Sequence, residues 1–256
     1  YELFTGNEVG AMLLEYICSE RTKMGTMPAD PVAVKTIVTT DIAAKIAEEY
    51  GVKLIEVLTG FKFIGEQIGF LEDKGQEDRY IFGFEESYGY LAGSYVRDKD
   101  AVVASMLICE MAAFYRTKGI SLIQARENMY KKYGVYVHSQ SSFVCEGVTG
   151  MERMKEIMSD LRTNTPKTIG GLTVTRFEDY LASTSVDTAT GAKTMLTLPK
   201  SDVLTFKLTD GASVIIRPSG TEPKIKAYYT TTGTTKAEAS ALEKTISDDF
   251  AKILGF

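Results

Sequence analysis

Short apolar segments alternate with helical patterns along the first half of the chain. Residues 32–38, 53–57 and 80–84 have the composition of buried strands, and helical spacing follows them at 41–50, 61–71 and 100–118. Strands that alternate with helices form βαβ units, so the strands become parallel neighbours in one sheet. This order predicts an α/β domain of three layers, with a mixed or mainly parallel sheet and helices on both faces.

Capping signals mark where several of these helices begin. Thr5 followed by Glu8 is a capping box and predicts a helix start. Ser121 is a second cap, for a helix that runs to Tyr133.

The first four residues have the pattern of the end of a strand, and the chain begins with Tyr rather than Met. We therefore expect a fragment of a longer protein.

The second half has a different pattern, in which strands are clustered between two helices. Strands are predicted at 136–144, 172–180, 203–208, 213–217 and 224–230, and helices at 150–161 and 237–254. Asp210-Gly211 is a strong hairpin signal, whereas residues 183–193 have the Ser, Thr, Ala and Gly content of a loop. In the 150–161 helix, the inward positions are predicted to be Met151, Met154, Ile157, Met158 and Leu161. We predict a smaller α+β domain with an antiparallel sheet packed on two helices, and place the domains at 1–134 and 135–256.

Charge and composition argue against several classes of function. A formal net charge of −5 argues against nucleic-acid binding, which needs a basic surface. The three cysteines are widely spaced and His138 is the only histidine, so neither a disulfide framework nor a metal site is expected in this chain. The most apolar run, 102–114, is interrupted by Glu110 and is too short to span a bilayer. With no signal peptide visible, these features favour a cytoplasmic protein without a membrane partner.

The segment from Arg217 to Lys224 joins two predicted strands and has the chemistry of an anion site. Arg217 has a planar fork that suits a phosphate, and Ser219 and Thr221 add hydroxyl donors. Gly220 allows successive backbone N–H groups to turn toward an anion. Lys224 and Lys226 raise the local potential. Composition alone also fits a polar hairpin loop, because Pro, Ser and Gly are ordinary turn residues.

Glu85, Glu86 and Ser87 directly follow the 80–84 strand. Carboxylates at the end of a strand accept hydrogen bonds from sugar hydroxyls, so these residues suit a polyhydroxyl ligand. Paired acids also occur in glycoside hydrolases, but adjacent loop residues rarely reach the opposed separation that this chemistry requires. A solvated acidic turn fits the same residues.

Two further segments follow the same logic. Thr59-Gly60-Phe61-Lys62 leaves a strand and opens a helix, whose N-terminus can receive an anion; a plain strand-to-helix turn is the alternative. The segment from Arg97 to Asp100 precedes the long helix and also fits a simple capped start, with Asp100 favouring the helix dipole.

These four segments, in this order, resemble the phosphohexomutase family, and the resemblance covers essentially the whole chain as that family's third and fourth domains. Residues 84–87 resemble the family's sugar-reading loop, and residues 217–223 resemble the phosphate loop of its last domain. Residues 59–62 are similar to the phosphoglucomutase form of the third-domain loop, and residues 97–100 to its basic active-site segment.

The resemblance implies an isomerase that interconverts glucose 1-phosphate and glucose 6-phosphate through a phosphoserine and glucose 1,6-bisphosphate. It implies a catalytic role for Lys99, near the reacting oxygen. It further implies substrate binding by Thr59, Gly60, Lys62, Glu85, Ser87, Arg217, Ser219, Gly220, Thr221 and Lys224. The phosphate that is not transferred would be held by the Arg217 loop, and the sugar hydroxyls by Glu85 and Ser87.

The family's serine loop and its Asp-rich magnesium loop have no match in this chain. The resemblance therefore implies that Mg²⁺ ligands lie upstream, that a missing N-terminal half is the main partner besides the hexose phosphate, and that the isolated chain is inactive. Phosphomannomutases of the family carry Gly-His after the Glu-x-Ser core, where this chain has Tyr88-Gly89-Tyr90. A phosphopentomutase, a phosphomannomutase and a non-catalytic sugar-phosphate-binding module remain as alternatives.

Overall fold

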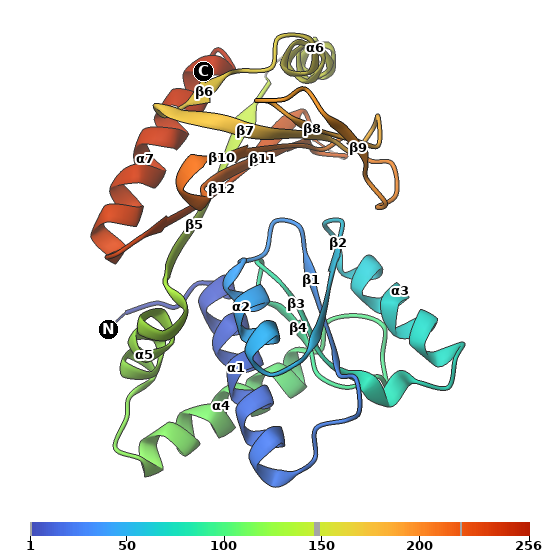
Figure 1. Ribbon diagram of the computed structural model, residues 1–256, viewed down its shortest axis with the longest axis vertical. Helices are drawn as coiled ribbons and strands as arrows, with labels where there is room; N and C mark the ends of the chain where they lie inside the picture. Colours follow the sequence, from blue (N-terminus) through green and yellow to red (C-terminus); the bar gives the residue numbers. More distant parts are fainter. Residues whose placement is uncertain (1, 146–148, 221) are drawn as a thin grey trace. The chain divides into compact units, whose positions relative to one another are not determined.

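The structure is a computed structural model that describes residues 2–145, 149–220 and 222–256. The chain divides into two compact units, residues 1–134 and 135–256 (Figure 1). Each unit has its own sheet and its own apolar core.

The first unit is built on a four-stranded sheet with the order β2-β1-β3-β4. Its strands are β1 (Val32–Thr36), β2 (Lys53–Val57), β3 (Tyr80–Glu85) and β4 (Gly89–Leu91). β1 pairs in parallel with both β2 and β3, and β4 runs antiparallel to β3. The carboxyl ends of the three parallel strands therefore lie at one edge of the sheet.

Helices cover both faces of this sheet, as the sequence predicts. They are α1 (Gly6–Met24), α2 (Ile42–Glu49), α3 (Phe61–Glu72), α4 (Ala101–Thr117) and α5 (Leu122–Tyr133), with a 3₁₀ turn at Glu77–Arg79. Gly83 of β3 packs against Ile64 of α3, whereas its neighbour Phe84 packs against Gly10 of α1. Figure 1 shows α1 and α2 on one side of the strands and α3 on the other. Among the described residues, no helix combines the length and hydrophobicity needed to cross a membrane.

The predicted helix caps are confirmed. The Thr5 backbone N–H donates to the Glu8 carboxylate at 2.8 Å, and the Glu8 N–H donates to the Thr5 hydroxyl at 3.2 Å. The Ser121 hydroxyl accepts a hydrogen bond from Gln124 N at 3.1 Å. The strand expected at the start of the chain is wrong, since residues 2–4 have no regular structure and lead directly into the Thr5 cap.

The second unit is an antiparallel sheet packed on two helices. Its strands are β5 (Val135–Val144), β6 (Thr168–Ile169), β7 (Leu172–Asp179), β8 (Thr184–Asp187), β9 (Lys193–Met195), β10 (Leu204–Leu208), β11 (Ser213–Pro218) and β12 (Lys224–Gly233). They form the order β5-β12-β11-β10-β7-β8-β9, and β6 pairs with β7. The helices are α6 (Gly150–Thr163) and α7 (Lys236–Ile253). The predicted fold class is therefore confirmed for both halves of the chain.

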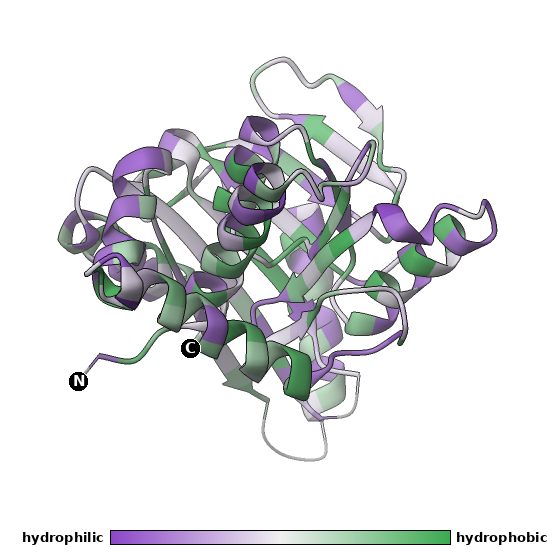
Figure 2. Ribbon diagram, turned by 90° about the horizontal axis from the view of Figure 1, so that it is seen from below, coloured by the Kyte–Doolittle hydropathy of each residue, from purple (hydrophilic) through white to green (hydrophobic). Residues whose placement is uncertain are grey.

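The core of the second unit comes from alternate strand residues and one stripe of each helix. Met154 and Met158 of α6 and Phe250 of α7 are fully enclosed with Phe206 of the sheet. Met151 departs from the predicted inward stripe, because its side chain is 49% exposed in the first turn of α6. Figure 2 shows bands of hydrophobic and hydrophilic colour that alternate along the helices.

Part of the predicted 183–193 loop is instead a β-hairpin. β8 pairs with β9, and the turn between them is closed by the Asp187 carboxylate, which accepts hydrogen bonds from the Ala189 and Thr190 N–H groups. The Ser and Thr content suggested a loop, but pairing with β7 extends these residues into the sheet. The Asp210-Gly211 hairpin is confirmed, with φ of 58° and 70° at the two residues, as such tight turns require.

Candidate functional site

The parallel strands bring two predicted site segments to the same edge of the first unit. Thr59 and Gly60 follow β2, and Glu85 is the last residue of β3. β1 lies between these strands, so the two segments are separated by two strand spacings, roughly 10 Å. In α/β sheets, ligands bind outside the carboxyl ends of the strands.

Lys99 belongs to a third segment that is fastened at two points. A Cβ atom at Gly65 of α3 would lie 2.2 Å from the Arg97 carbonyl oxygen, so the chain passes directly over this helix. The Asp100 N–H donates to the Tyr90 carbonyl of β4 at 2.9 Å. Asp100 also caps α4 through hydrogen bonds from Val102 N and Val103 N. Residues 97–100 therefore form a capped helix start, and they also leave the side chain of Lys99 exposed.

The 85–88 turn, which starts at the last residue of β3 and leads into β4, presents oxygen atoms. The Ser87 hydroxyl donates to one Glu86 carboxylate oxygen at 2.8 Å. The other oxygen of Glu86 and the hydroxyl oxygen of Thr59 are buried and lack a hydrogen-bond partner among the described residues. Gly89 leaves room for the Glu85 carboxylate, since a Cβ there would lie 2.7 Å from its oxygen. These acceptors suit the hydroxyl groups of a polyhydroxyl ligand.

The two predicted lysines of the first unit are both exposed. The Lys99 ammonium lies 3.0 Å from the Asp98 carboxylate, and its hydrogen bond lowers the pKa of Asp98. Lys62, in the first turn of α3, places its ammonium 4.8 Å from the centre of the Phe63 ring. Both contacts are to near neighbours in sequence and leave the ammonium groups accessible to an anion.

In the second unit, Arg217 and Lys224 lie at the two ends of the loop that joins β11 to β12. The Ser219 N–H donates to the Lys224 carbonyl at 2.8 Å, which closes the loop. Gly220 is exposed, and nothing lies within 4 Å of the position that a Cβ would take. Thr221, the remaining predicted site residue, lies outside the described residues.

Arg217 is oriented by its sheet neighbours. The register places it directly opposite Lys226 of β12, and its Nε–H donates to the Tyr228 hydroxyl at 3.4 Å. The guanidinium carbon is 6.0 Å from the centre of the Tyr228 ring. Like charges opposite one another destabilise a sheet, and in the described part of the chain no carboxylate forms an ion pair with Arg217. An anion would relieve this repulsion.

The structure distinguishes Lys224 and Lys226, the two lysines at the start of β12. Lys224 forms an ion pair with Glu222 at 2.5 Å, and this hydrogen bond lowers the pKa of Glu222. Lys226 instead lies beside Arg217 by strand register. From the sequence alone, Lys226 was expected only to raise the local potential. Strand register, which composition does not specify, places Lys226 directly opposite Arg217.

Metal chemistry is not suggested by these side chains. Within the ranges that the structure describes, no group of three His, Cys, Asp or Glu residues is arranged to hold a metal ion.

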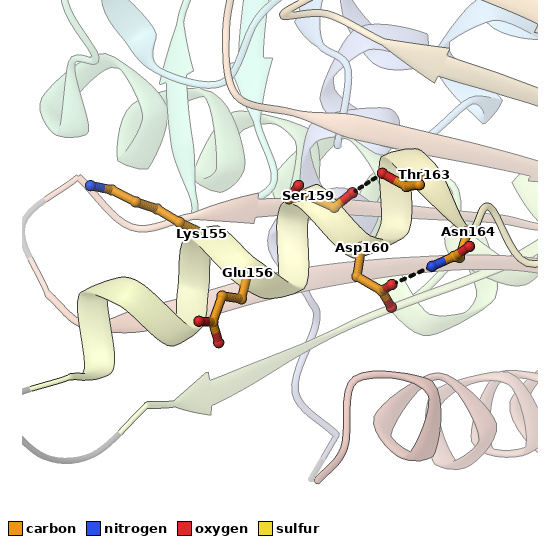
Figure 3. A pocket seen from close by; sticks show the side chains of 6 residues that line it. All are labelled: Lys155, Glu156, Ser159, Asp160, Thr163 and Asn164. Atoms are coloured by element: carbon orange, nitrogen blue, oxygen red, sulfur yellow. Dashed lines mark hydrogen bonds between the residues drawn. The ribbon is translucent and has the colours of Figure 1, made fainter.

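A separate hollow lies on the surface of α6 and has a different character (Figure 3). It is lined by Lys155, Glu156, Ser159, Asp160, Thr163 and Asn164. Asn164 donates to the Asp160 carboxylate at 2.6 Å, and the Thr163 hydroxyl donates to the Ser159 carbonyl at 3.0 Å. These polar groups are satisfied within one helix, so the hollow has no features of a built binding site.

Comparison with known proteins identifies both units. The family model described as phosphoglucomutase/phosphomannomutase, alpha/beta/alpha domain III, matches residues 5–133, and the model of the C-terminal domain matches residues 161–248. A phosphoglucomutase from Staphylococcus aureus strain bovine RF122 / ET3-1 is 37% identical over 225 residues, which cover 88% of this chain and 39% of the relative. A phosphoglucomutase from strain MRSA252 of the same species gives the same identity and coverage.

Solved structures show the same fold. Parafusin, a phosphoglucomutase from Paramecium in its open form, aligns with a TM-score of 0.68 at 19% identity, covering 99% of this chain and 42% of that protein. A phosphoglucomutase/phosphomannomutase family protein from Burkholderia thailandensis aligns with a TM-score of 0.55 at 13% identity, covering 99% of this chain and 42% of that protein. The chain spans 39% of the length of the S. aureus relatives, and it belongs to the phosphoglucomutase/phosphomannomutase family, of which it contains domain III and the C-terminal domain.

Proposed function

We propose that this chain is the substrate-binding half of a phosphoglucomutase. The complete protein would interconvert glucose 1-phosphate and glucose 6-phosphate through a phosphoserine and glucose 1,6-bisphosphate. The first unit would bind the sugar, and the second would bind the phosphate that is not transferred. The glucose form is favoured over mannose or pentose because the curated relatives at 36–37% identity are phosphoglucomutases.

In the first unit, Glu85 and Ser87 would accept and donate hydrogen bonds to the sugar hydroxyls. Thr59 and Gly60 would line the same site from the end of β2, with Lys62 in the first turn of α3. Lys99 would place positive charge near the reacting oxygen. Phosphoryl transfer depends mainly on positioning and on electrostatic stabilisation, which these side chains supply without a metal ion of their own.

The observation that carries the proposal is the environment of Arg217. Its guanidinium is oriented through Nε by Tyr228 and faces Lys226, with no described carboxylate paired to it. The two terminal nitrogen atoms form a fork that matches two oxygens of a phosphate. Ser219, Gly220, Thr221 and Lys224 would complete the phosphate loop. Remote phosphate binding would hold the reacting end of the sugar in place.

The remaining components belong to the same proposal. Mg²⁺ would be bound by residues of the complete protein outside this chain, as the resemblance to the family implies. The phosphorylated serine would lie there as well. A cytoplasmic location is consistent with the free thiols of Cys18, Cys109 and Cys145.

The proposal is tested by replacing Arg217. In Arg217→Ala, the affinity for glucose 6-phosphate and for inorganic phosphate should fall by about 1.5–3 kcal/mol, because a charged hydrogen-bond donor is lost. Arg217→Lys should recover only part of this loss, since it keeps the charge but not the fork. Arg176→Ala, which removes an exposed arginine from β7 of the same sheet, is the matched control. Calorimetry that found equal affinities for Arg217→Ala and the unchanged chain would refute the phosphate-binding role.

A further inference from the structure

The first turn of α1 lies directly against the 85–88 turn. A Cβ atom at Gly6 would be only 2.0 Å from the Glu86 carbonyl oxygen and 2.8 Å from the Tyr88 nitrogen. Both contacts are to backbone atoms, which cannot move aside as the end of a side chain can. Gly6 therefore allows an approach of helix and turn that every other residue would prevent.

Two tyrosines fix the turn to the same segment. The buried Tyr90 hydroxyl donates to the Gly6 carbonyl at 2.9 Å, and the Tyr88 hydroxyl donates to the Phe4 carbonyl at 3.1 Å. Tyr88 has a φ of 61°, in the left-handed region that is unfavourable for a bulky residue. The α1 segment thus contacts the turn on both sides of a residue with an unfavourable backbone conformation.

Asn7 connects the same turn of α1 to a second loop of the edge. Its side chain is 6% exposed, and its oxygen accepts a hydrogen bond from Thr40 N at 2.9 Å. Thr40 follows β1, the strand between β2 and β3. Adjacent residues of one helix turn therefore contact the loop after β1 and the turn after β3.

The helix turn that makes these contacts is itself anchored. The Glu8 carboxylate caps Thr5 and also accepts a hydrogen bond from the Tyr130 hydroxyl of α5 at 3.0 Å. The guanidinium of Arg126, which is 3% exposed, lies 3.4 Å from the same carboxylate. A buried ion pair with additional hydrogen bonds is costly to break, so this support is rigid.

We infer that Gly6 and Asn7 are positioning residues for the proposed sugar site. Gly6 sets the position of the 85–88 turn, and Asn7 sets that of the loop after β1. Neither residue needs to touch the ligand, since each acts through the backbone of the loop that it contacts. This inference rests on the proposed function, because it assigns the 85–88 turn to sugar hydroxyls.

The test uses Gly6→Ala, Asn7→Ala and Asn7→Asp in the whole chain, with titrations followed by NMR chemical shifts. Glucose 6-phosphate should bind about tenfold more weakly to Gly6→Ala and Asn7→Ala, as expected for the loss of one to two hydroxyl hydrogen bonds. Inorganic phosphate should bind unchanged, since it needs only the Arg217 loop. Asn7→Asp should restore the affinity, because it keeps an oxygen acceptor for Thr40 N near a helix N-terminus.

Ile68→Val is the control that separates an effect of lower stability from an effect of displaced loops. This change removes one buried methyl group from α3 and lowers the stability of the chain without altering either loop, so it should leave both affinities unchanged. If Gly6→Ala does not fold, the comparison of Asn7→Ala with Asn7→Asp still decides the matter. Glucose 6-phosphate affinities equal to that of the unchanged chain in Gly6→Ala and Asn7→Ala would overturn the inference alone. Failure of the unchanged chain to bind glucose 6-phosphate would overturn the proposed function and the inference with it.

Discussion

Lys35 is a charged residue that the first unit encloses completely. Its ammonium group on β1 donates to the Thr39 carbonyl at 3.1 Å and lies 3.0 Å from Asp41 and 2.5 Å from Glu56. Burial opposes the charge, but attraction to Glu56 and Asp41 outweighs it and raises the pKa of Lys35. The charge therefore ties the loop after β1 to the neighbouring strand β2.

Replacing Lys35 should reveal this contribution through its pH dependence. Lys35→Met keeps the length of the side chain but leaves the Thr39 carbonyl without its donor, so we expect a loss of about 1.5–3 kcal/mol at neutral pH. Because the folded-state pKa is raised, the contribution is complete below the unfolded pKa of about 10.4 and is lost as pH rises through the folded value. The difference between the two chains should therefore stay constant up to about pH 10 and narrow above it.

The measurement is urea unfolding of both chains across that pH range, with Lys53→Met as the control. Lys53 is an exposed lysine at the start of β2, and its replacement should change the stability by no more than about 0.5 kcal/mol. A difference that is already absent at neutral pH would show that the buried charge stabilises nothing.

At this scale, the sequence predicted residue types better than residue partners. The chemistry of Arg217, Glu85 and Lys99 could be assessed from local composition, because each lies in a short segment with Gly, Pro or paired charges. The pairing of Lys224 with Glu222 and the position of Lys226 opposite Arg217 could not, since they depend on rotamers and strand register. Asn7 and Gly6 gave no local signal, because their contacts are to residues more than thirty positions away.

Among the elements, α3 contains two glycines in very different surroundings. Gly65 lies under the Arg97 backbone, where a Cβ would be 2.2 Å from the carbonyl oxygen, whereas nothing lies within 4 Å of a Cβ at Gly69. Glycine in a helix interior costs about 0.5–1 kcal/mol relative to alanine. The same substitution should therefore have opposite effects four residues apart on one helix.

We expect Gly69→Ala to stabilise the chain by about 0.5–1 kcal/mol and Gly65→Ala to destabilise it by about 1–3 kcal/mol. Gly65→Ala should also displace the segment that carries Lys99 from the start of α3. Urea midpoints measure the first effect, and chemical-shift changes at residues 97–100 measure the second. Stabilisation by both substitutions would mean that the segment does not pack on α3 in solution.

Helices were predicted more completely than strands, because the signals for a helix lie within one segment of the sequence. Capping boxes and 3.6-residue spacing lie within single segments, so the starts at Thr5 and Ser121 could be read directly. β4 has only three residues, too few for a period to be visible. β8 depends on pairing with β7, and β9 depends on pairing with β8. The first turn of α6 shows the limit of periodicity, since Met151 fits the stripe but lies beyond the end of the core.

At the scale of the whole molecule, each unit encloses its own apolar cluster. The cluster of the first unit includes Val34 and Ile64, and that of the second includes Phe206 and Phe250. Such separate cores are expected of domains that fold as independent units. The order of the segments along the chain predicted the two fold classes, because strand and helix patterns change near Gly134. The family matches follow the same order, with domain III preceding the C-terminal domain.

The proposed division of labour makes a prediction about activity. In the proposed function, the four segments discussed above bind sugar and phosphate but supply no phosphorylated serine, and the chain spans 39% of the length of its phosphoglucomutase relatives. Binding energy without a phosphoryl donor lowers no chemical barrier, because catalysis requires interactions with the transition state. The purified chain should therefore bind glucose 6-phosphate but should not form it from glucose 1-phosphate, even with added Mg²⁺ and glucose 1,6-bisphosphate.

This absence of turnover can be measured with a coupled assay for glucose 6-phosphate, with a full-length S. aureus phosphoglucomutase as positive control. Turnover that persists through purification and is abolished by Lys99→Met would contradict the assignment of the phosphoryl donor to another part of the protein, and would place the complete chemistry within these two units.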